Sequence, residues 1–242
     1  MRTVCIIEAR MRSSRLPGKV LAPVLGRPLL AHMVERLQRS ERLDEVVIAT
    51  ADDPSCDPIA ALADELDVEA FRGSEDDVLA RVLGAADSAE AELIVSAAGD
   101  CPLLDPLVVD HVVEAYMGGE ADFCSNTRTD TYPRGMEVRV FSAAALAEID
   151  GETDDPSDRE HVSMYFWTHP ERYRLLEVES PDASLGEFRL TVDEPEDLQL
   201  VRAIFERLYP VRPDFDLDDI AALLRSDPSL PALNAHVQHD EV

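Results

Sequence analysis

Residues 3–19 read TVCIIEARMRSSRLPGK, a short apolar run followed at once by a loop with four cationic side chains. The run is typical of a buried strand, and the loop adds two hydroxyls and one glycine. In an open α/β sheet, ligands bind outside the carboxyl ends of the strands, where this loop is expected. One guanidinium group can donate two parallel hydrogen bonds to phosphate oxygens, and Lys19 adds a mobile point charge. The stretch indicates a polyphosphate site, with a solvated basic loop as the alternative.

Outward from this loop, strand-like runs alternate with amphipathic segments, which predicts an α/β fold with a mostly parallel central sheet flanked by helices. Strands are expected over residues 3–7, 45–50, 68–72, 93–97 and 122–125, and helices over 29–39, 58–66, 76–86 and 106–117. After residue 130 the pattern predicts a smaller mixed-strand extension, with strands over 137–141, 174–179 and 188–192 and helices over 157–168, 195–208 and 217–224. We expect one domain over residues 1–225 and a frayed C-terminal tail over residues 226–242.

The composition of the chain excludes several classes of protein. Its 242 residues include 50 Asp and Glu against 22 Lys and Arg, for a net charge of -28. Such acidity repels nucleic acid phosphates, so general nucleic acid binding is not expected. No apolar run approaches membrane-spanning length, and the four cysteines lack the spacing of a disulfide framework or a zinc site. We expect a cytoplasmic protein that does not bind membranes and keeps its thiols reduced.

The positive charges are few and unevenly placed. Lys19 is the only lysine, and residues 1–42 hold nine Lys and Arg against three Asp and Glu. Both adaptation to high salt and a coding sequence rich in G and C explain an acidic, lysine-poor chain. An excess of cations around the first loop suits a single phosphate site on an otherwise acidic protein.

Two aspartates follow predicted strands and are candidate metal ligands. Asp100 lies in AGDCPL, residues 98–103, and Asp193 ends the apolar run LTV before a helix that begins at Pro195. Carboxylates at the carboxyl ends of strands would face the same crevice as the first loop, and Mg²⁺ prefers such oxygens. For Asp100 the alternative is an ordinary turn or capping aspartate. Whether the two aspartates meet does not follow from their spacing.

Four motifs, taken together and in this order, resemble a known family: EARMRSSRLPGK (residues 8–19), GDCPL (99–103), DREHV (158–162) and LTVDEPEDL (190–198). The chain is similar to the cytidylyltransferases that include the sialic-acid and KDO cytidylyltransferases, and in particular to the branch named for spore-coat polysaccharide biosynthesis. The resemblance runs from about residue 3 to about residue 208. Each motif alone is moderately specific, whereas the combination is specific.

The resemblance implies a GT-A-like nucleotidyltransferase fold, CTP as donor substrate and Mg²⁺ as cofactor. It assigns catalytic roles to Arg10, Arg15, Lys19 and Asp100, and the metal to Asp100 and Asp193. The residues that it places around the nucleotide are Ala9, Arg10, Ser13, Ser14, Arg15, Lys19, Ala49, Thr50, Arg72 and Ser74. Because related enzymes are often dimers, a homodimer is also expected.

The acceptor is expected to bind the second half of the chain. The candidate residues there are Asn126, Tyr132, Arg134, Glu137, Arg159 and His161. Arg134 and Arg159 are suited to clamp a carboxylate or phosphate, and Asn126 and Glu137 to bind hydroxyls. For His161 a structural role is the more common one for a lone histidine in a helix. The residues do not identify the acceptor beyond a small acidic molecule.

The predicted reaction is in-line attack of an acceptor oxygen on the α-phosphate of CTP, with loss of pyrophosphate. Such a transfer demands positioning and charge neutralisation, for which Mg²⁺ and the cationic loop are suited. Three alternatives stay open: a sugar-phosphate nucleotidyltransferase that uses another NTP, a GT-A glycosyltransferase, and a catalytically silent nucleotide-binding protein. Pro102 argues against the glycosyltransferase, because it occupies the second position of the Asp-x-Asp pair of those enzymes.

Overall fold

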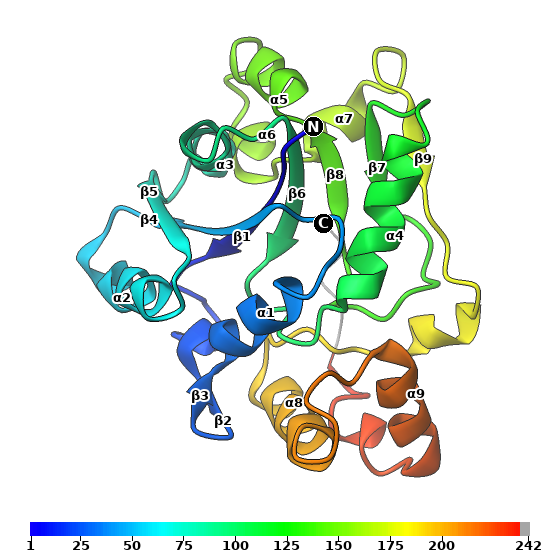
Figure 1. Ribbon diagram of the computed structural model, residues 1–242. Helices are drawn as coiled ribbons and strands as arrows, with labels where there is room; N and C mark the ends of the chain where they lie inside the picture. Colours follow the sequence, from blue (N-terminus) through cyan, green and yellow to red (C-terminus); the bar gives the residue numbers. More distant parts are fainter. Residues whose placement is uncertain (238–242) are drawn as a thin grey trace.

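Within residues 1–237, which the computed structural model describes, seven strands form one sheet (Figure 1). Their order is β5-β4-β1-β6-β8-β7-β9, and their bounds are Thr3–Ala9 (β1), Glu45–Ala51 (β4), Glu69–Gly73 (β5), Leu93–Ala98 (β6), Phe123–Ser125 (β7), Arg139–Ser142 (β8) and Leu175–Glu177 (β9). β8 runs antiparallel to both neighbours, while the other pairings in the sheet are parallel. A separate hairpin pairs Pro23–Val24 (β2) with Arg27–Pro28 (β3). The predicted α/β fold with a mostly parallel sheet is confirmed.

β1 lies in the middle of the parallel part because its side chains are apolar toward both faces. Val4, Cys5, Ile6 and Ile7 are fully buried, as expected of a strand covered by helices on both sides. Ile7 pairs with Ile48 of β4 on one side and with Ala97 of β6 on the other. The carboxyl ends of these three strands therefore meet at one edge, on the side of the β2–β3 hairpin in Figure 1.

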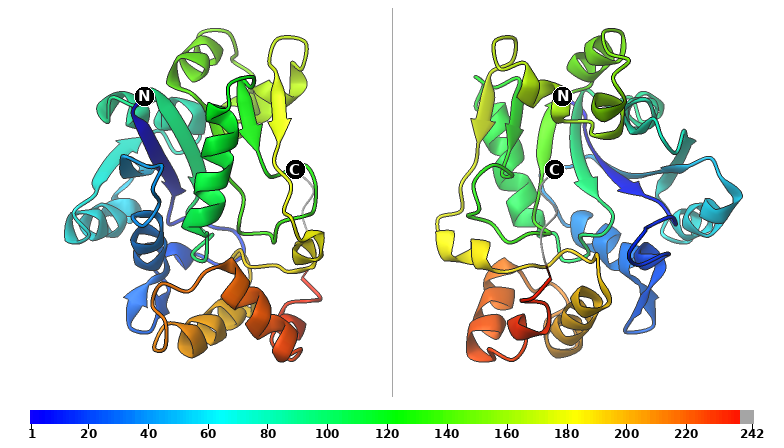
Figure 2. Two further views of the ribbon diagram at one scale, coloured as in Figure 1. Left: turned by 45° about the vertical axis from the view of Figure 1, so that its right-hand side comes forward. Right: turned by 180° about the vertical axis from the view of Figure 1, so that it is seen from behind.

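Helices cover both faces of the sheet (Figure 2). Their bounds are Leu29–Leu37 (α1), Asp57–Glu65 (α2), Val78–Ser88 (α3), Pro106–Met117 (α4), Ala143–Asp150 (α5), Pro156–Glu160 (α6), Met164–Thr168 (α7), Pro195–Leu208 (α8) and Leu217–Ser226 (α9). The apolar faces of α1, α2, α4, α8 and α9 share one hydrophobic core with one face of the sheet. The opposite face forms a second core with α3, α5 and α7. The sheet thus separates two apolar layers.

Helix starts follow the capping residues in the sequence. Asp105 precedes α4, and its carboxylate accepts a hydrogen bond from the backbone N–H of Leu107 at 2.8 Å, with Pro106 in the first turn. α8 begins with a capping box, in which Glu194 and Asp197 each accept a hydrogen bond from the other's backbone N–H. Both starts fall at the residues predicted from the sequence.

Three segments between residues 142 and 192 differ from the sequence prediction. Residues 157–168 form two short helices, α6 and α7, instead of one. α5 was not predicted, although Ser142 caps it by accepting a hydrogen bond from the N–H of Ala145 at 3.1 Å. Residues 188–192 were expected to form a strand, but only Arg189 forms a bridge, with Arg134. This segment instead forms backbone hydrogen bonds with two loops. The N–H of Leu190 donates to the carbonyl of Arg134, and the N–H of Val192 donates to the carbonyl of Asp100.

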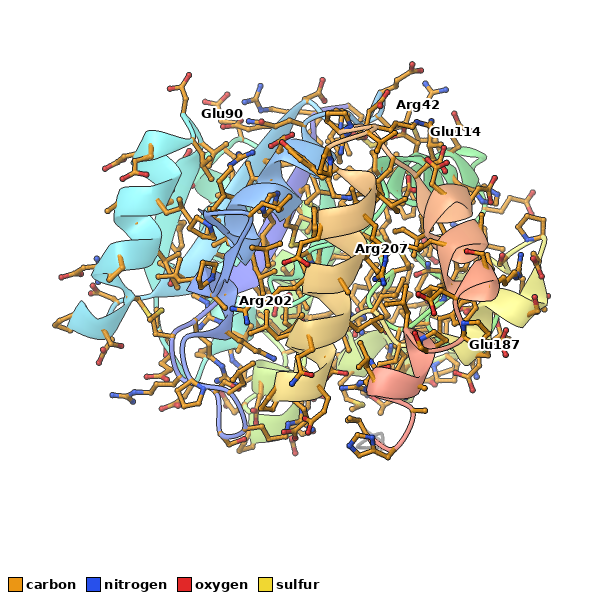
Figure 3. All side chains as sticks on the ribbon, turned by 90° about the horizontal axis from the view of Figure 1, so that it is seen from below. Arg42, Glu90, Glu114, Glu187, Arg202 and Arg207 are labelled. Carbon is orange, nitrogen blue, oxygen red and sulfur yellow. The ribbon has the colours of Figure 1, made fainter. Side chains whose placement is uncertain are left out.

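α8 is bound to the elements on both of its sides. Figure 3 shows this helix between the β2–β3 hairpin and α9, with Arg202 on the hairpin side and Arg207 on the α9 side. The Arg202 guanidinium donates to the carbonyl of Pro23 at 3.1 Å, and that of Arg207 lies 3.3 Å from the Asp227 carboxylate. The hairpin, α8 and α9 therefore form a connected layer below the sheet edge.

The C-terminal segment is packed where a frayed tail was expected. Leu230 and Asn234 are 3% and 4% exposed, and residues 231–233 form a turn of 3-10 helix. The expectation is wrong for residues 226–237 because an apolar and an amide side chain there are buried against α8 and the segment before it. Residues 238–242, the remainder of the predicted tail, lie outside the described residues.

The four cysteines form no disulfide. Cys5, Cys56, Cys101 and Cys124 are all unpaired and buried. Burial raises the pKa of Cys5 to about 12, which makes its thiol a poor nucleophile.

None of the helices in residues 1–237 combines the length and apolar character needed to cross a membrane.

Replacing Asp105 should destabilise the fold strongly. Its carboxylate caps α4, accepts the N–H of Leu217 at the start of α9, and lies 3.9 Å from the buried guanidinium of Arg36. Asp105→Ala should lower the free energy of unfolding by about 3–5 kcal/mol, because it leaves a buried cation without its counter-charge. Asp105→Asn keeps a capping oxygen and should lose less. Urea unfolding measures both, and a loss below about 1 kcal/mol for Asp105→Ala would contradict this role.

Candidate active site

The cationic loop after β1 folds back on itself before it presents Lys19. The backbone N–H of Gly18 donates to the carbonyl of Met11 at 2.9 Å and closes the loop. Gly18 has a φ of 71°, in the left-handed region that favours glycine. Lys19 follows as the first residue of a short 3-10 helix, Lys19–Leu21. The Gly-Lys pair thus turns the chain so that the ammonium group reaches the sheet edge.

Asp100 follows β6 through a glycine that lies against the end of β1. The N–H of Gly99 donates to the carbonyl of Glu8 at 2.9 Å. A Cβ at this position would lie 2.9 Å from the same carbonyl oxygen, closer than side chains allow. Only glycine permits this approach of the two backbones. Asp100 is therefore held beside the carboxyl end of the central strand.

The Lys19 ammonium joins the two candidate metal ligands. Its Nζ lies 2.6 Å from Oδ2 of Asp100 and 2.8 Å from Oδ1 of Asp193. The three side chains are 12%, 24% and 16% exposed, so water screens their charges only in part. The fold brings together the first loop, the turn after β6 and the segment before α8, which the sequence left unconnected. We call these three residues the Lys19 cluster.

Further contacts hold Asp193 in place. The N–H of Val192 donates to the carbonyl of Asp100 at 2.8 Å, which ties the two aspartate loops together. The guanidinium of Arg15 lies 3.0 Å from Oδ1 of Asp193, and that of Arg189 lies 2.6 Å from Oδ2. Asp193 thus contacts three cations.

The charges in the Lys19 cluster stabilise one another. Burial alone would lower the pKa of Lys19, but the charges and hydrogen bonds of Asp100 and Asp193 outweigh it and raise that pKa. Burial alone would raise the pKa of Asp193, yet Lys19, Arg15 and Arg189 bring it below its ordinary value. Lys19 and Asp193 are therefore both ionised at neutral pH.

A cavity of about 560 Å³ opens at the same edge of the sheet. Most of the predicted acceptor residues line it, namely Asn126, Tyr132, Arg134, Glu137 and His161. Residues of β1, β6 and β8 form its inner wall, and residues 160–164 with Trp167 of α7 form another. Its size is typical of a small-molecule site. The fold therefore places the predicted acceptor half beside the Lys19 cluster.

Three residues of the inner wall were not among the predicted site residues: Glu8, Ser96 and Arg139. The hydroxyl of Ser96 donates to the Glu8 carboxylate at 2.8 Å, and Arg139 pairs with Ser96 in the strand register. Burial raises the pKa of Glu8 despite the Ser96 hydrogen bond and the charge of Arg139. Glu8 could have been found as a charged residue that interrupts an apolar strand. Arg139 shows no comparable signal, because exposed strand ends often carry arginine.

Two predicted acceptor residues have their polar groups engaged by the protein. The side-chain amide of Asn126 donates to the carbonyl of Met136 at 2.8 Å and accepts the N–H of Val138 at 2.7 Å. These bonds fix the loop between β7 and β8, so Asn126 shapes the cavity wall. The hydroxyl of Tyr132 lies 3.2 Å from Nδ1 of His111.

Arg159, which was predicted to bind the acceptor, has its guanidinium engaged by other residues of the protein. Its Nη2 lies 2.5 Å from Asp77 and 2.9 Å from Asp150, and Nε lies 3.0 Å from the other oxygen of Asp77. The side chain also donates to the carbonyls of Asp150 and Thr153, and it does not line the cavity. Arg159 joins α6 to the start of α3, and its contact with an acceptor stays a prediction.

The predicted nucleotide residues divide into an exposed and a buried group. Arg10, Ser14 and Arg15 are exposed, and Ser13 is half-buried with its hydroxyl accepting the N–H of Leu16 at 3.4 Å. The side chains of Ala9, Ala49 and Thr50 are buried in the sheet, so any contact with a nucleotide would come from their backbone.

Arg72 and Ser74 also have partners within the protein. The Arg72 guanidinium lies 2.6 Å from Asp57 and donates to the carbonyl of Asp53 at 3.0 Å. The hydroxyl of Ser74 accepts the N–H of Asp77 at 3.0 Å and supports the start of α3. These contacts shape the loops around β5.

The donor set at the Lys19 cluster fits a hard divalent cation. Two carboxylate oxygens converge on one point, which the Lys19 ammonium occupies at hydrogen-bond distance from both. Mg²⁺ is commonly bound by one or two carboxylates together with substrate phosphates. No group of three or more His, Cys, Asp or Glu side chains in residues 1–237 forms a closed metal cage. The arrangement therefore suits a metal that is completed by a ligand.

Comparison with known proteins supports the same interpretation. The family model described as cytidylyltransferase matches residues 4–214. The spore coat polysaccharide biosynthesis protein SpsF of Bacillus subtilis is 32% identical over 92% of this chain and 94% of its own length. A 3-deoxy-manno-octulosonate cytidylyltransferase of Anaeromyxobacter dehalogenans is 30% identical over 82% of this chain and 96% of its own.

A solved structure is similar over the full length of both chains. The structure of a cytidylyltransferase from Leptospira borgpetersenii superposes with a TM-score of 0.90 and 30% sequence identity, and the match covers 100% of each chain. The matched family model includes the cationic loop, Asp100 and Asp193. The chain belongs to the cytidylyltransferase family.

Proposed function

We propose that this chain transfers CMP from CTP to a small acidic acceptor and releases pyrophosphate. The observation that carries the proposal is the Lys19 cluster, in which two carboxylates converge on one cation, and the charge of Asp100 acts on Glu8 and Glu137 of the cavity. Family membership supports the cytidylyl transfer, and the arrangement of charges supports this place for it. The acceptor and the metal are the parts of the proposal that need experiment.

Asp100 and Asp193 would hold Mg²⁺ in this proposal. When bound, the ion would neutralise phosphate charge and make the α-phosphate more electrophilic. A cation between the two carboxylates would repel the Lys19 ammonium, which would then be drawn to the phosphates instead. The flexible four-carbon stem of lysine allows such a movement.

The cationic loop would bind the triphosphate. Arg10 is exposed and makes no ion pair within the described part of the chain. Arg15 reaches Asp193 with its guanidinium and stands at the edge of the same cluster. Together with Lys19 these side chains would orient the triphosphate for in-line attack and stabilise the charge on the departing pyrophosphate.

The cavity supports an acidic acceptor because it is lined by three arginines that form no ion pair among the described residues. Arg128, Arg134 and Arg139 line it, and none of them forms an ion pair with another residue of 1–237. Elsewhere arginines are commonly paired with carboxylates, as in the Arg42–Glu114 ion pair that Figure 3 places at the protein surface. These guanidinium groups favour a ligand with a carboxylate or phosphate, while Glu8, Asp130, Glu137 and Glu160 of the same cavity suit its hydroxyl groups.

Two carboxylates of the cavity could accept a proton from a hydroxyl acceptor. Burial raises the pKa of Glu8 and that of Glu137, and a higher pKa makes a carboxylate a stronger base. Glu137 accepts the N–H of Gly135 at 2.6 Å, whereas Glu8 accepts the hydroxyl of Ser96. A phosphate or phosphonate acceptor would need no base at all.

A cytoplasmic location and a homodimer belong to the same proposal and rest on the family resemblance.

The choice of donor and the role of Asp100 can be tested together. Pyrophosphate release should be fastest with CTP among the four NTPs when a panel of acidic sugars, phosphates and phosphonates is offered. Asp100→Asn should reduce that turnover at least about 100-fold, more than the loss of a residue that only supports a metal ligand. The control is Glu114→Gln, which removes a surface carboxylate and should leave turnover unchanged. A preference for UTP or GTP, or full activity of Asp100→Asn, would contradict the proposal.

The acceptor site can be tested at Arg139. Arg139→Met should raise the KM for the acidic acceptor roughly 10- to 100-fold, the range expected for a lost hydrogen bond to a charged group. The KM for CTP should change little, because Arg139 lines the cavity and the predicted nucleotide residues do not. Arg174→Met is the matched control, since Arg174 is exposed and pairs with Asp122. An equal rise of KM for CTP would place Arg139 in the nucleotide site instead.

A further inference from the structure

The packed C-terminal segment reaches the candidate active site through one buried amide. Asn234 donates from Nδ2 to Oδ1 of Asp197 at 2.8 Å and to the carbonyl of Arg189 at 3.0 Å. It is 4% exposed, although its neighbours Ala235 and His236 are exposed. The segment therefore turns one polar side chain inward, toward residues that contact Asp193.

Asp197 accepts the hydrogen bond of this amide and lies at the centre of a hydrogen-bond network. Its carboxylate is fully buried and accepts the N–H groups of Asp193 and Glu194, both at 2.9 Å. Nε of Arg189 lies 3.0 Å from Oδ1 of the same carboxylate. Asp197 thus fixes the backbone at Asp193.

Arg189 continues the network to the side chain of Asp193. Its Nη2 donates to Oδ2 of Asp193 at 2.6 Å, while Oδ1 faces Lys19 at 2.8 Å. One oxygen of Asp193 is therefore held from behind and the other is presented to the Lys19 cluster. We propose that Asn234 is a positioning residue, which orients Asp193 as a metal ligand through Asp197 and Arg189.

This role follows from how buried charges are held. A buried carboxylate that loses a hydrogen-bond donor moves toward its remaining partners. When Asp197 loses the Asn234 amide, these partners are Arg189 and the backbone of the Asp193 turn. A displaced Arg189 would no longer hold Oδ2 of Asp193. Residues that support a metal ligand in this way typically change metal affinity 10- to 100-fold when removed. Asn234 lies beyond residue 214, where the family match ends, so the family match assigns it nothing.

The proposal rests on the proposed function, in which Asp193 binds a metal, and it can be tested without knowing the acceptor. Mn²⁺ is titrated into the whole chain with saturating CTP, and free Mn²⁺ is measured by electron paramagnetic resonance. Asn234→Ala should weaken Mn²⁺ binding roughly 10- to 100-fold. Asn234→Asp is nearly isosteric but places a negative charge beside Asp197, and should weaken binding at least as much.

Leu230→Ala is the matched control. Leu230 lies in the same segment and is 3% exposed, but it has no side-chain group in the network. This variant should lower the melting temperature at least as much as Asn234→Ala while keeping wild-type Mn²⁺ affinity. Equal Mn²⁺ affinity in Asn234→Ala and the wild type would overturn the positioning role. So would a loss of affinity in Leu230→Ala as large as that in Asn234→Ala.

The same titration separates this inference from the proposed function. If the wild-type chain with CTP binds no Mn²⁺, the metal site itself is wrong, and the role of Asn234 fails with it. If the wild type binds Mn²⁺ and Asn234→Ala binds it equally well, the metal site stands and only the positioning role is overturned.

Discussion

The contact of one ammonium group with two carboxylates organises the candidate site of this protein. Lys19 comes from the loop after β1, Asp100 from the turn after β6 and Asp193 from the segment before α8, so the contact joins three distant parts of the chain. A local feature of each part allows this contact. Gly18 has a left-handed backbone, Gly99 lets the backbone after β6 lie against the end of β1, and a hydrogen-bond network holds Asp193. The fold is in this sense arranged around one charge cluster.

The acidity of the chain makes the arginines of the cavity unusual. With 50 acidic and 22 basic residues, a cation on this protein easily finds a carboxylate, and many arginines do. Arg128, Arg134 and Arg139 line the cavity and form no ion pair with any described residue. An acidic surface around such a cavity repels large polyanions, whereas the three guanidinium groups give a small anion hydrogen-bond donors inside it. The net charge of -28 is therefore compatible with a phosphate chemistry that it first argues against.

Much of the fold could be predicted from the sequence, because the central strands are continuous apolar runs and the helices have strong capping signals. β1, β4, β6 and α4 lie within a few residues of their predicted bounds. The C-terminal half was harder to predict, because its strands are three or four residues long and one apolar run, 188–192, bonds to two loops instead of a strand. The buried role of residues 226–237 depends on a single amide and a few apolar side chains, which no local pattern marks.

The candidate site was predictable in its motifs but not in its contacts. The pairing of Asp100 with Asp193 through Lys19 needs the sheet order, and spacing along the chain does not contain it. Arg159 illustrates the reverse case: a cation in a suggestive motif has two carboxylates of its own, on α3 and α5. Glu8 could have been found as a charge within an apolar strand, whereas Arg139 was missed because a charge at the end of a strand is common and only the cavity distinguishes it.

The most direct test of the central claim is a crystal structure of the chain with CTP and Mn²⁺, with anomalous scattering recorded at the manganese edge. The account predicts one anomalous peak between the carboxylates of Asp100 and Asp193, next to the α-phosphate, with the Lys19 ammonium moved from the carboxylates to the phosphates. A triphosphate bound elsewhere, or Lys19 still bridging the two aspartates with manganese and CTP in place, would contradict it.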